Sequence, residues 1–338
     1  MLGFWGKLSK PIFVLAPMAD VTDAAFRRII AEVSKSASTR DGEPRRGGPD
    51  VMWTEFVSAD GLALAPEAGR KKLLKSLEYS EAERPIVAQF FTSVPENMKK
   101  AAELARELGF DGVDINMGCP DKNVEKQGAG ASLMKNVLLA RELINAAKEG
   151  AGSLPVSVKT RIGYNKPELE NWLPEILEED VAVVTIHART RKEMSKVSAR
   201  WEFVKRAVEI RNASGKETLI LGNGDVRNLK EARMRIEETG CNGIMFGRAI
   251  FGNPWLFADL DKPPSIEEKL RVLVKHIKLF EELLGEHKSF AVMKKHFKAY
   301  LSGIDGIGDL RVKLMNTNNA SEVEAIISEF IKNRIIPV

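Results

Sequence analysis

The hydrophobic pattern of the chain alternates between short apolar runs and segments of helical period. Between most of the runs, apolar residues recur every three to four positions, as they do along residues 95–108, and this spacing predicts amphipathic helices. Eight strands that are each followed by a helix are typical of a (β/α)8 TIM barrel, whereas a doubly wound sheet usually has fewer strands. The apolar runs predict strands at residues 12–17, 51–55, 85–90, 112–116, 155–160, 181–187, 218–223 and 243–247.

The strand pattern stops after Phe257, where a polar, proline-containing linker begins. Ser265 and Glu268 then form a capping box that opens a long amphipathic helix, and Ser321 with Glu324 opens another. This pattern is typical of a helical appendage. We therefore expect an α/β fold in which a TIM barrel is followed by a small all-helical C-terminal domain.

The domain boundaries follow from this change of pattern. We expect residues 1–258 to form the barrel and residues 264–338 to form the helical domain. A segment rich in Gly, Pro and Arg, residues 40–49, is predicted to be a loop between the first helix and the second strand.

Composition agrees with a globular chain. The 338 residues exceed the usual size of one domain, and they suit a barrel of about 250 residues with an appendage. A hydrophobic content of 44% with 29% charged residues argues against disorder, and no apolar run approaches the roughly 18 residues of a membrane span. The first ten residues lack the features of a signal peptide, so we expect a cytoplasmic protein without a membrane partner.

The counts of metal-binding and sulfur residues exclude two further classes of protein. The chain has two cysteines, which rules out a disulfide framework, and four histidines without the His-x-x-x-His spacing of a catalytic zinc site. We therefore expect no metal. The formal net charge of +4 is mild, so the position of the charges matters more than their sum.

Polar side chains occur at the carboxyl ends of the predicted strands, where TIM barrels carry their chemistry. Because successive side chains of a strand point to opposite faces, Asp114 and Asn116 share one face of the fourth strand. By the same alternation, Lys159 lies with Arg161 on the fifth strand, and His187 lies with Thr185 on the sixth. The pattern predicts an active site at the mouth of the barrel.

The last two strands end in glycines that favour a phosphate site. Asn223, Gly224 and Asp225 follow the seventh strand, and Gly247 with Arg248 follows the eighth. Glycines let backbone N–H groups approach phosphate oxygens, and an arginine adds charge. The chain lacks a G-x-G-x-x-G fingerprint and a Walker A motif, so a Rossmann dinucleotide site or a P-loop is not expected.

Two further residues suggest chemistry at the mouth. Cys119 follows the fourth strand between Gly118 and Pro120, and an unperturbed thiol with a pKa of about 8.5 is a neutral proton donor at pH 7. Lys159 has three possible roles: a Schiff-base amine, a phosphate ligand, or a cation facing a cofactor that gains negative charge. Cys241, by contrast, is expected to be a small buried apolar residue.

Taken together, these motifs resemble the tRNA-dihydrouridine synthase family. The resembling stretches cover most of the chain, and the MGCP block with its QGAGASLM continuation is specific. The stretches are LAPMADVTDAAFR (15–27), VAQF (87–90), GVDINMGCPDKNVEKQGAGASLM (112–134), VKTRIG (158–163), TIHARTR (185–191), NGDV (223–226), IMFGRAIFGNPWLF (244–257), VMKKHFKAYLSG (292–303) and LRVKLM (310–315).

The resemblance implies an enzyme with tightly bound FMN that reduces uridines of tRNA with NADPH as a transient hydride donor. It implies Cys119 as the general acid. The residues it implies for the cofactor, with Asn116 and His187 lining the flavin or the uracil, are Pro17, Met18, Ala19, Gln89, Asn116, Lys159, His187, Asn223, Gly224, Asp225, Gly247 and Arg248. The residues that we expect to contact substrate and RNA are Arg161, Arg189, Lys294, Lys295, Lys298 and Arg311.

The implied reaction reduces the C5=C6 bond of uracil. Hydride reaches C6 from the flavin, Cys119 protonates C5, and Lys159 stabilises the anionic reduced flavin. The target uridine must leave its stack to enter such a pocket. In residues 288–313, six basic and two acidic residues give a local charge of +4, which we interpret as an RNA-binding surface on the helical domain; Phe297 and Tyr300 are expected to add stacking contacts.

Three other functions remain open. The first is a flavin barrel that acts on a free pyrimidine, similar to dihydroorotate dehydrogenase, and the second is a class I aldolase with Lys159 as Schiff base. The third is a tRNA-binding protein without catalysis. The chain departs from the family where Met194 and Lys196 stand at positions that often hold Tyr and Gly, and in a long insert at residues 36–49. We expect a monomer; the motifs do not specify the uridine position or a preference for NADPH over NADH.

Overall fold

A computed structural model describes residues 2–35, 39–40, 43–44, 47–260, 262–304 and 306–335. In these residues eight parallel strands form a barrel, and all eight predicted strands are present. The sheet runs in the order β1-β11-β10-β9-β8-β7-β6-β4, and a parallel bridge between Val14 and Val51 joins its two ends. The strands are β1 (Ile12–Leu15), β4 (Met52–Trp53), β6 (Ile86–Phe91), β7 (Gly112–Met117), β8 (Val156–Arg161), β9 (Val183–His187), β10 (Leu219–Asn223) and β11 (Gly243–Phe246).

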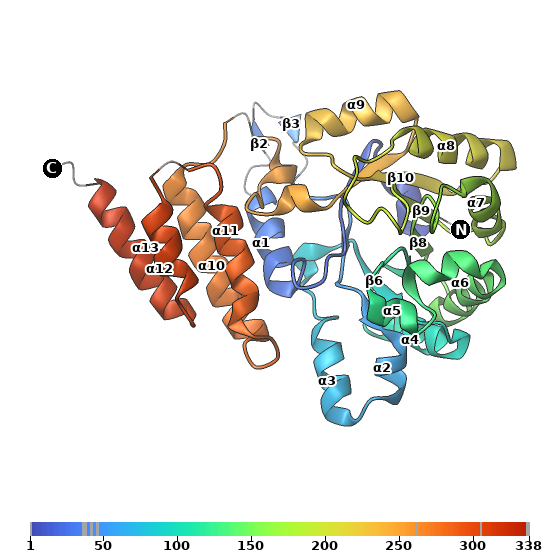
Figure 1. Cartoon of the computed structure of the whole chain (residues 1–338), viewed down its shortest axis with the longest axis horizontal. Helices are drawn as coiled ribbons and strands as arrows, with labels where there is room; N and C mark the ends of the chain where they lie inside the picture. The colour runs from blue at the N-terminus through green and yellow to red at the C-terminus, as the bar shows by residue number, and fades with distance from the viewer. Residues whose placement is uncertain are drawn as a thin grey trace. The chain divides into compact units, whose positions relative to one another are not determined.

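Helices cover the outside of this barrel, in the order of the chain (Figure 1). They are α4 (Pro95–Glu107), α6 (Val137–Ala151), α7 (Leu169–Glu178), α8 (Glu202–Ser214) and α9 (Leu229–Thr239). A short helix, α5 (Lys122–Lys126), follows β7 in the chain. Their ends follow local sequence: the Asn228 side chain accepts from the Glu231 N–H at the start of α9, and Gly240 at φ 70° ends it. The predicted TIM barrel is confirmed.

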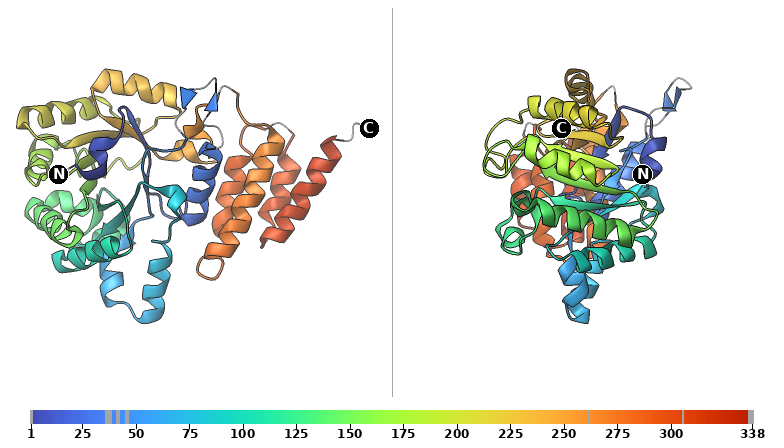
Figure 2. Two further views of the ribbon diagram at one scale, coloured as in Figure 1. Left: turned by 180° about the vertical axis from the view of Figure 1, so that it is seen from behind. Right: turned by 90° about the vertical axis from the view of Figure 1, so that its right-hand side faces the viewer.

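A helical hairpin extends away from the barrel after the second strand (Figure 2). It consists of α2 (Ala59–Leu64) and α3 (Glu67–Lys75), and it follows a short strand, β5 (Val57–Ser58), that pairs with the end of β6. The sequence pattern did not predict β5.

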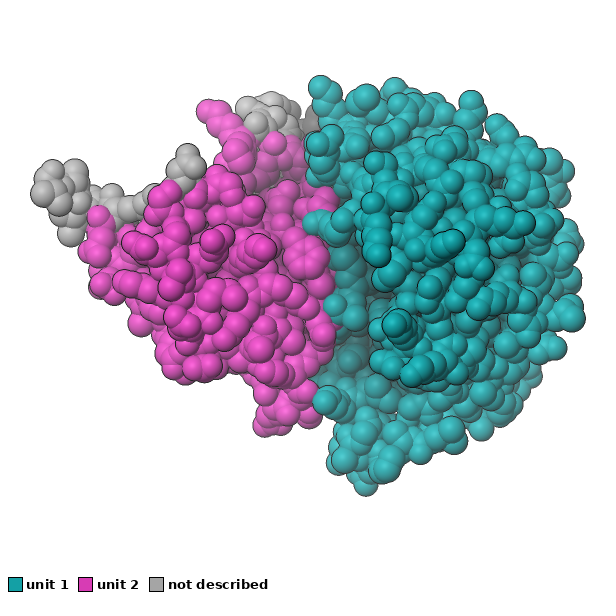
Figure 3. Space-filling view, in the orientation of Figure 1, with its two compact units in different colours: residues 1–19, 49–248 teal, residues 20–48, 249–338 magenta. Residues whose placement is uncertain are grey.

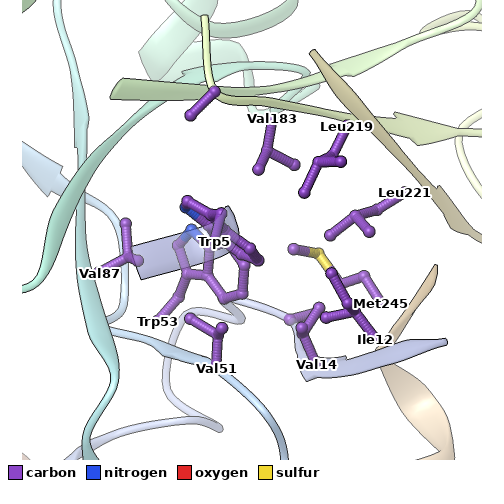
Figure 4. Close-up of a cluster of buried hydrophobic side chains, with 12 residues drawn as sticks. Trp5, Ile12, Val14, Val51, Trp53, Val87, Val183, Leu219, Leu221 and Met245 are labelled. Atoms are coloured by element: carbon purple, nitrogen blue, oxygen red, sulfur yellow. The ribbon is translucent and has the colours of Figure 1, made fainter. Parts of the chain in front are cut away.

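Inside the barrel, an apolar floor lies below a polar mouth. Trp5, from a 3-10 helix at Gly3–Lys7, packs against Trp53 with ring centroids 5.7 Å apart. Val183, Leu221 and inward side chains of β1, β6 and β11 belong to the same buried cluster (Figure 4). The alternation that points these apolar residues inward also points inward the polar residues further along each strand. The floor therefore leaves the carboxyl ends of the strands as the site for polar chemistry.

The chain divides into two compact units, coloured separately in Figure 3. Unit 1, Met1–Ala19 with Pro49–Arg248, contains the barrel, and unit 2 contains Asp20–Gly48 with Ala249–Val338. The predicted C-terminal helices are present in unit 2. They are α10 (Ile266–Leu284), α11 (Met293–Tyr300), α12 (Gly308–Met315) and α13 (Ala320–Ile335).

Unit 2 also contains α1 (Ala24–Lys35), which the sequence pattern assigned to the barrel domain. Within this unit α1 packs against α10, and the Phe26 ring stacks on His276 with centroids 4.8 Å apart. The helix satisfies the (β/α) count, but its apolar face is covered by the C-terminal helices. The division into a barrel domain of residues 1–258 and a helical domain of residues 264–338 stays a prediction.

The segment predicted as a loop contains two short strands, β2 (Thr39–Arg40) and β3 (Glu43–Pro44), which pair antiparallel. Residues 36–38, 41–42 and 45–46 of the predicted insert lie outside the described residues. No described helix has the length and apolar character needed to cross a membrane.

Candidate active site

A chain of side-chain hydrogen bonds crosses the mouth of the barrel from β6 to the segment after β7. Gln89 Nε2 donates to Asp114 Oδ2 at 2.6 Å, and Asn116 Nδ2 donates to Gln89 Oε1 at 3.0 Å. Asn116 Oδ1 accepts from the backbone N–H groups of Gly118, at 3.1 Å, and Cys119, at 2.9 Å. The inward residues of two strands therefore hold the backbone next to the cysteine.

Cys119 lies in a closely packed turn after β7. Its carbonyl accepts from the Ala131 N–H at 2.9 Å, and a Cβ on Gly130, whose φ is 63°, would lie 2.8 Å from that carbonyl oxygen. Burial raises the pKa of the Cys119 thiol, while Arg161 and Lys159 oppose the shift. The thiol is therefore protonated at neutral pH, which suits a proton donor and not a thiolate nucleophile.

Lys159 stands at the end of β8 with its charge inside the barrel. Its Nζ donates to Asn223 Oδ1 at 3.4 Å, and Asn223 Nδ2 in turn donates to the Met245 carbonyl at 2.8 Å. Burial and the nearby Arg161 lower the pKa of Lys159 to about 8, and Asp114 opposes that shift. Burial raises the pKa of Asp114 to about 6. Both groups are mainly charged at pH 7, and each titrates near the neutral range.

His187 is held as a neutral ring. Arg189 Nη1 lies 3.0 Å from His187 Nε2, and because a guanidinium only donates, Nε2 must accept and the ring proton must be on Nδ1. Burial, with the cations of Arg161 and Lys159, lowers the pKa of His187 well below its ordinary value. The side chain is therefore a neutral donor through Nδ1 at the mouth.

The predicted phosphate residues lie together after β10 and β11. Asp225, at φ 59°, accepts from Arg248 at 2.5 Å, from the Ala199 N–H at 2.8 Å, and from Arg189. These partners lower the pKa of Asp225, although burial opposes them, so the carboxylate is ionised and accepts only. Its side chain therefore orients the two arginines, and binding of a phosphate by Arg248 and the backbone here stays a prediction.

The segment after β1 lies beside this site. A Cβ built on Gly247 would have Met18 Sδ at 3.8 Å as its nearest neighbour, so the backbone of Gly247 faces an open space lined by Met18. Pro17 is buried, Met18 is half-buried and Ala19 is exposed. At the neighbouring turn, a Cβ on Gly224, whose φ is 136°, would lie 2.7 Å from the Ala199 side chain. The glycine is therefore required there.

The two arginines predicted to contact RNA in unit 1 are almost fully buried. Arg161 is 6% exposed, and its Nε donates to the Gly118 carbonyl at 2.7 Å; Arg189 is 2% exposed, and its Nε donates to the Val197 carbonyl at 2.6 Å. The described contacts of both side chains therefore fix the loops around Cys119 and His187. Contact of either with RNA stays a prediction.

The remaining predicted RNA residues belong to unit 2. Lys298 and Arg311 are exposed, and Lys294 and Lys295 are half-buried. The expected stacking of RNA bases on Phe297 and Tyr300 is wrong, because both rings are buried, at 0% and 1% exposure. They belong to the apolar core of the helices, which their three-residue spacing satisfies equally well.

Sequence reasoning placed Asp114 inside the barrel but gave it no role. In the structure Ser157 Oγ donates to Asp114 Oδ1 at 2.5 Å, so both belong to the hydrogen-bonded chain described above. A third group was missed entirely: Tyr164, after β8, lies under Lys135 and Arg191, and Arg191 is paired with Glu125. Both cysteines are free, and no described group of His, Cys, Asp and Glu has the arrangement of a metal site.

Comparison with known proteins places this chain in a family. Residues 14–335 match the family described as dihydrouridine synthase (Dus). The chain belongs to the dihydrouridine synthase family. It is 41% identical over 329 residues to a probable tRNA-dihydrouridine synthase 2 of Bacillus subtilis (strain 168), covering 97% of this chain and 96% of that one. A probable tRNA-dihydrouridine synthase of Staphylococcus aureus (strain MRSA252) is 39% identical over 329 residues, with 97% and 95% covered.

The family membership and the prediction of an enzyme are thereby confirmed. Among solved structures, the barrel is similar to that of 2-naphthoyl-CoA reductase, with a TM-score of 0.53 at 11% identity. The similarity covers 76% of this chain and 50% of that one, and it concerns the fold alone.

Proposed function

We propose that this protein reduces the C5=C6 bond of uridines in tRNA to 5,6-dihydrouridine, with bound FMN and with NADPH as the hydride source. The observation that carries the proposal is the position of Cys119, whose neutral thiol follows β7 at the mouth of the barrel and whose backbone is held by the Asn116 side chain and the Gly130 turn. The names of the relatives, probable tRNA-dihydrouridine synthases that the chain covers over almost their whole length, support tRNA as the substrate.

The donor set at the mouth suits an anionic cofactor such as FMN. The half-buried Lys159 and the buried Arg161 are cations on successive inward positions of β8, and burial lowers the pKa of Lys159 to about 8 and that of Arg161 to about 10. The open backbone at Gly247 and the Arg248 side chain, 63% exposed, supply donors for a phosphate. Bound FMN would supply two-electron transfer between a nicotinamide and the pyrimidine.

The residues of the chain would then divide the remaining work. Lys159 places a positive charge beside the cofactor, where negative charge develops. Cys119 donates its proton to C5 of the uracil, and Arg161, through the Gly118 carbonyl, keeps the turn of Cys119 in place. Asn116 and His187 present fixed hydrogen-bonding groups next to the reacting ring. The role of each residue is part of the proposal.

The size of the substrate also sets requirements. A uridine must leave its stack to reach the mouth of a barrel, so the protein must hold the RNA around it. The lysines and arginine of α11 and α12 are our proposed phosphate contacts. A transient NADPH fits a chain in which no dinucleotide-binding fingerprint occurs.

Purification tests the proposal at its first step. The protein should be yellow, should release FMN on denaturation, and should lose its colour when NADPH is added without RNA. It should then be reoxidised by unmodified tRNA and not by free uridine or orotate. A colourless protein that cannot be reconstituted with FMN contradicts the proposal, and reoxidation by a free pyrimidine favours a dihydroorotate dehydrogenase-like enzyme.

A further inference from the structure

We propose that Asp114 is a positioning residue for Cys119: as an acceptor, its carboxylate sets the direction of the Gln89 and Asn116 amides. This proposal rests on the proposed function only for the role of Cys119 in catalysis. The positioning itself follows from the order of donors and acceptors in the hydrogen-bonded chain.

The first step is the environment of Asp114. The side chain is 1% exposed, on β7 between the inward residues of β6 and β8. Both carboxylate oxygens are engaged: Oδ1 accepts from Ser157 Oγ and Oδ2 accepts from Gln89 Nε2. Because an ionised carboxylate has no proton to donate, the group that faces Oδ2 must be the NH2 side of the Gln89 amide.

The second step carries this direction to the cysteine. With its NH2 turned to Asp114, Gln89 presents Oε1 to Asn116, so Asn116 must turn its own NH2 toward Gln89. Asn116 Oδ1 then faces the other way and accepts from the N–H groups of Gly118 and Cys119. Reversing either amide would place donor against donor or acceptor against acceptor inside a buried site, which is costly.

The third step concerns the effect of the amide directions on the position of Cys119. Two hydrogen bonds fix the backbone of Cys119: its carbonyl accepts from the Ala131 N–H, and its N–H donates to Asn116 Oδ1. The second bond exists only while the Asn116 amide keeps its oxygen turned toward Cys119. Three residues that lie on the floor side of the turn thus control where the thiol is presented. Loss of the Asp114 carboxylate would therefore change the position of the Cys119 thiol without any contact between Asp114 and the substrate.

The experiment measures the reactivity of Cys119 directly. The full chain as purified is treated with iodoacetamide, and alkylation of Cys119 and of the buried Cys241 is followed by mass spectrometry of the two peptides. In Asp114→Asn, Gln89 and Asn116 are free to reverse, and Cys119 should react about fivefold faster. That factor corresponds to about 1 kcal/mol, the net contribution of one hydrogen bond. The Cys241 rate should not change.

A matched control exists on the same strand segment. Asp111, just before β7, also accepts through both oxygens, from Arg84 at 2.9 Å and from the Ile86 N–H at 2.7 Å, at the end of the barrel away from the mouth. Asp111→Asn should lower thermal stability but leave the alkylation rate of Cys119 as it is in the natural chain.

A rescue variant separates positioning from general damage. In Asp114→Asn with Gln89→Glu, the carboxylate moves from position 114 to position 89 in the series of hydrogen bonds. The amide at position 114 then donates to the carboxylate at position 89, and Asn116 donates to the other oxygen of that carboxylate. Ser157 still has an acceptor, the amide oxygen at position 114. Asn116 Oδ1 again faces Cys119, so the alkylation rate should return toward that of the natural chain. If Asp114→Asn does not fold, Gln89→Leu removes the same link and should accelerate alkylation in the same direction.

Two results would overturn the proposal. One is an alkylation rate of Cys119 that neither Asp114→Asn nor Gln89→Leu changes, and the other is a double variant no closer to the natural chain than Asp114→Asn. Since alkylation requires no tRNA and no turnover, it remains interpretable if the protein fails to reduce uridine. In that case the proposed function fails while the positioning of Cys119 stands.

Discussion

Arg189 donates to His187 Nε2 at 3.0 Å and, through its other nitrogens, to Asp225 and to the Val197 carbonyl. One buried guanidinium therefore joins the end of β9 to the loop after β10 and fixes the tautomer of the histidine between them. The histidine that could titrate near pH 6.5 in water is held neutral by its donor partner and by the surrounding cations.

The neutral state of His187 can be observed by NMR. Because its pKa is lowered, its ring should keep the 15N shifts of the neutral Nδ1–H tautomer from pH 8.5 down to pH 5.5, with the signal assigned through loss in His187→Gln. A lowered pKa leaves the group uncharged above that value, so no charge appears in this window. A ring that titrates near pH 6.5 would contradict the account.

Cys119→Ala should separate the two halves of the reaction. The variant should retain FMN and accept hydride from NADPH, because the thiol is needed only after the cofactor is reduced. Its turnover on tRNA should fall by about 10²–10⁴-fold, the usual contribution of general acid catalysis. Stopped-flow absorbance measures the first half and dihydrouridine formation the second. Cys241→Ala, at a buried site away from the mouth, is the control. If Cys119→Ala formed dihydrouridine as fast as the natural chain, Cys119 would have a structural role only.

Lys159→Ala should weaken both the retention of FMN and its reduction. Loss of a buried, hydrogen-bonded charge partner typically costs about 2–5 kcal/mol, so the Kd for FMN should rise by about 30-fold or more. Equilibrium titration of the apoprotein, followed by flavin fluorescence, measures this. The exposed Lys126→Ala on α5 is the control. Equal affinity in all three proteins would remove Lys159 from the cofactor site.

The barrel and its mouth were predictable because of how parallel strands are buried. A strand covered on both faces reads as a continuous apolar run, and the side-chain alternation at its end shows which polar residues turn inward. This is why Asn116, Lys159 and His187 were placed correctly at the mouth. A hydrophobic pattern does not name the partner of an apolar face, so the packing of α1 against α10 could not be read from it.

The burial of long polar side chains could not be predicted from the sequence either. The alternation along the strand placed Arg161 on the inward face, but only the three-dimensional structure shows that the carbonyls of Gly118 and Val197 accept from Arg161 and Arg189. Phe297 and Tyr300 share a helix with lysines, but their own face belongs to the core. Direction along a helix face, and not nearness in sequence, decides which side chains meet solvent.

The basic face of unit 2 is tested in the whole chain, because a cut near residue 261 would also uncover α1. Lys294→Glu with Lys298→Glu should weaken tRNA binding and flatten the dependence of log K on log salt by roughly 0.7–0.9 for each phosphate that a lysine no longer neutralises. Lys205→Glu with Lys230→Glu, exposed on α8 and α9, makes the same change in net charge. If the two variants had equal affinities for tRNA and equal salt dependences, the lysines of α11 would be an ordinary solvated helix face and not an RNA-binding surface.

The most direct measurement is the nucleoside content of tRNA before and after reaction. Unmodified tRNA is incubated with the purified protein, FMN and NADPH, then digested to nucleosides and analysed by mass spectrometry. The account predicts dihydrouridine, with the two added hydrogen atoms on C5 and C6, formed by the natural chain and almost absent with Cys119→Ala. Unchanged uridine with the natural chain, while NADPH still reduces its flavin, would contradict the proposal that tRNA is the substrate.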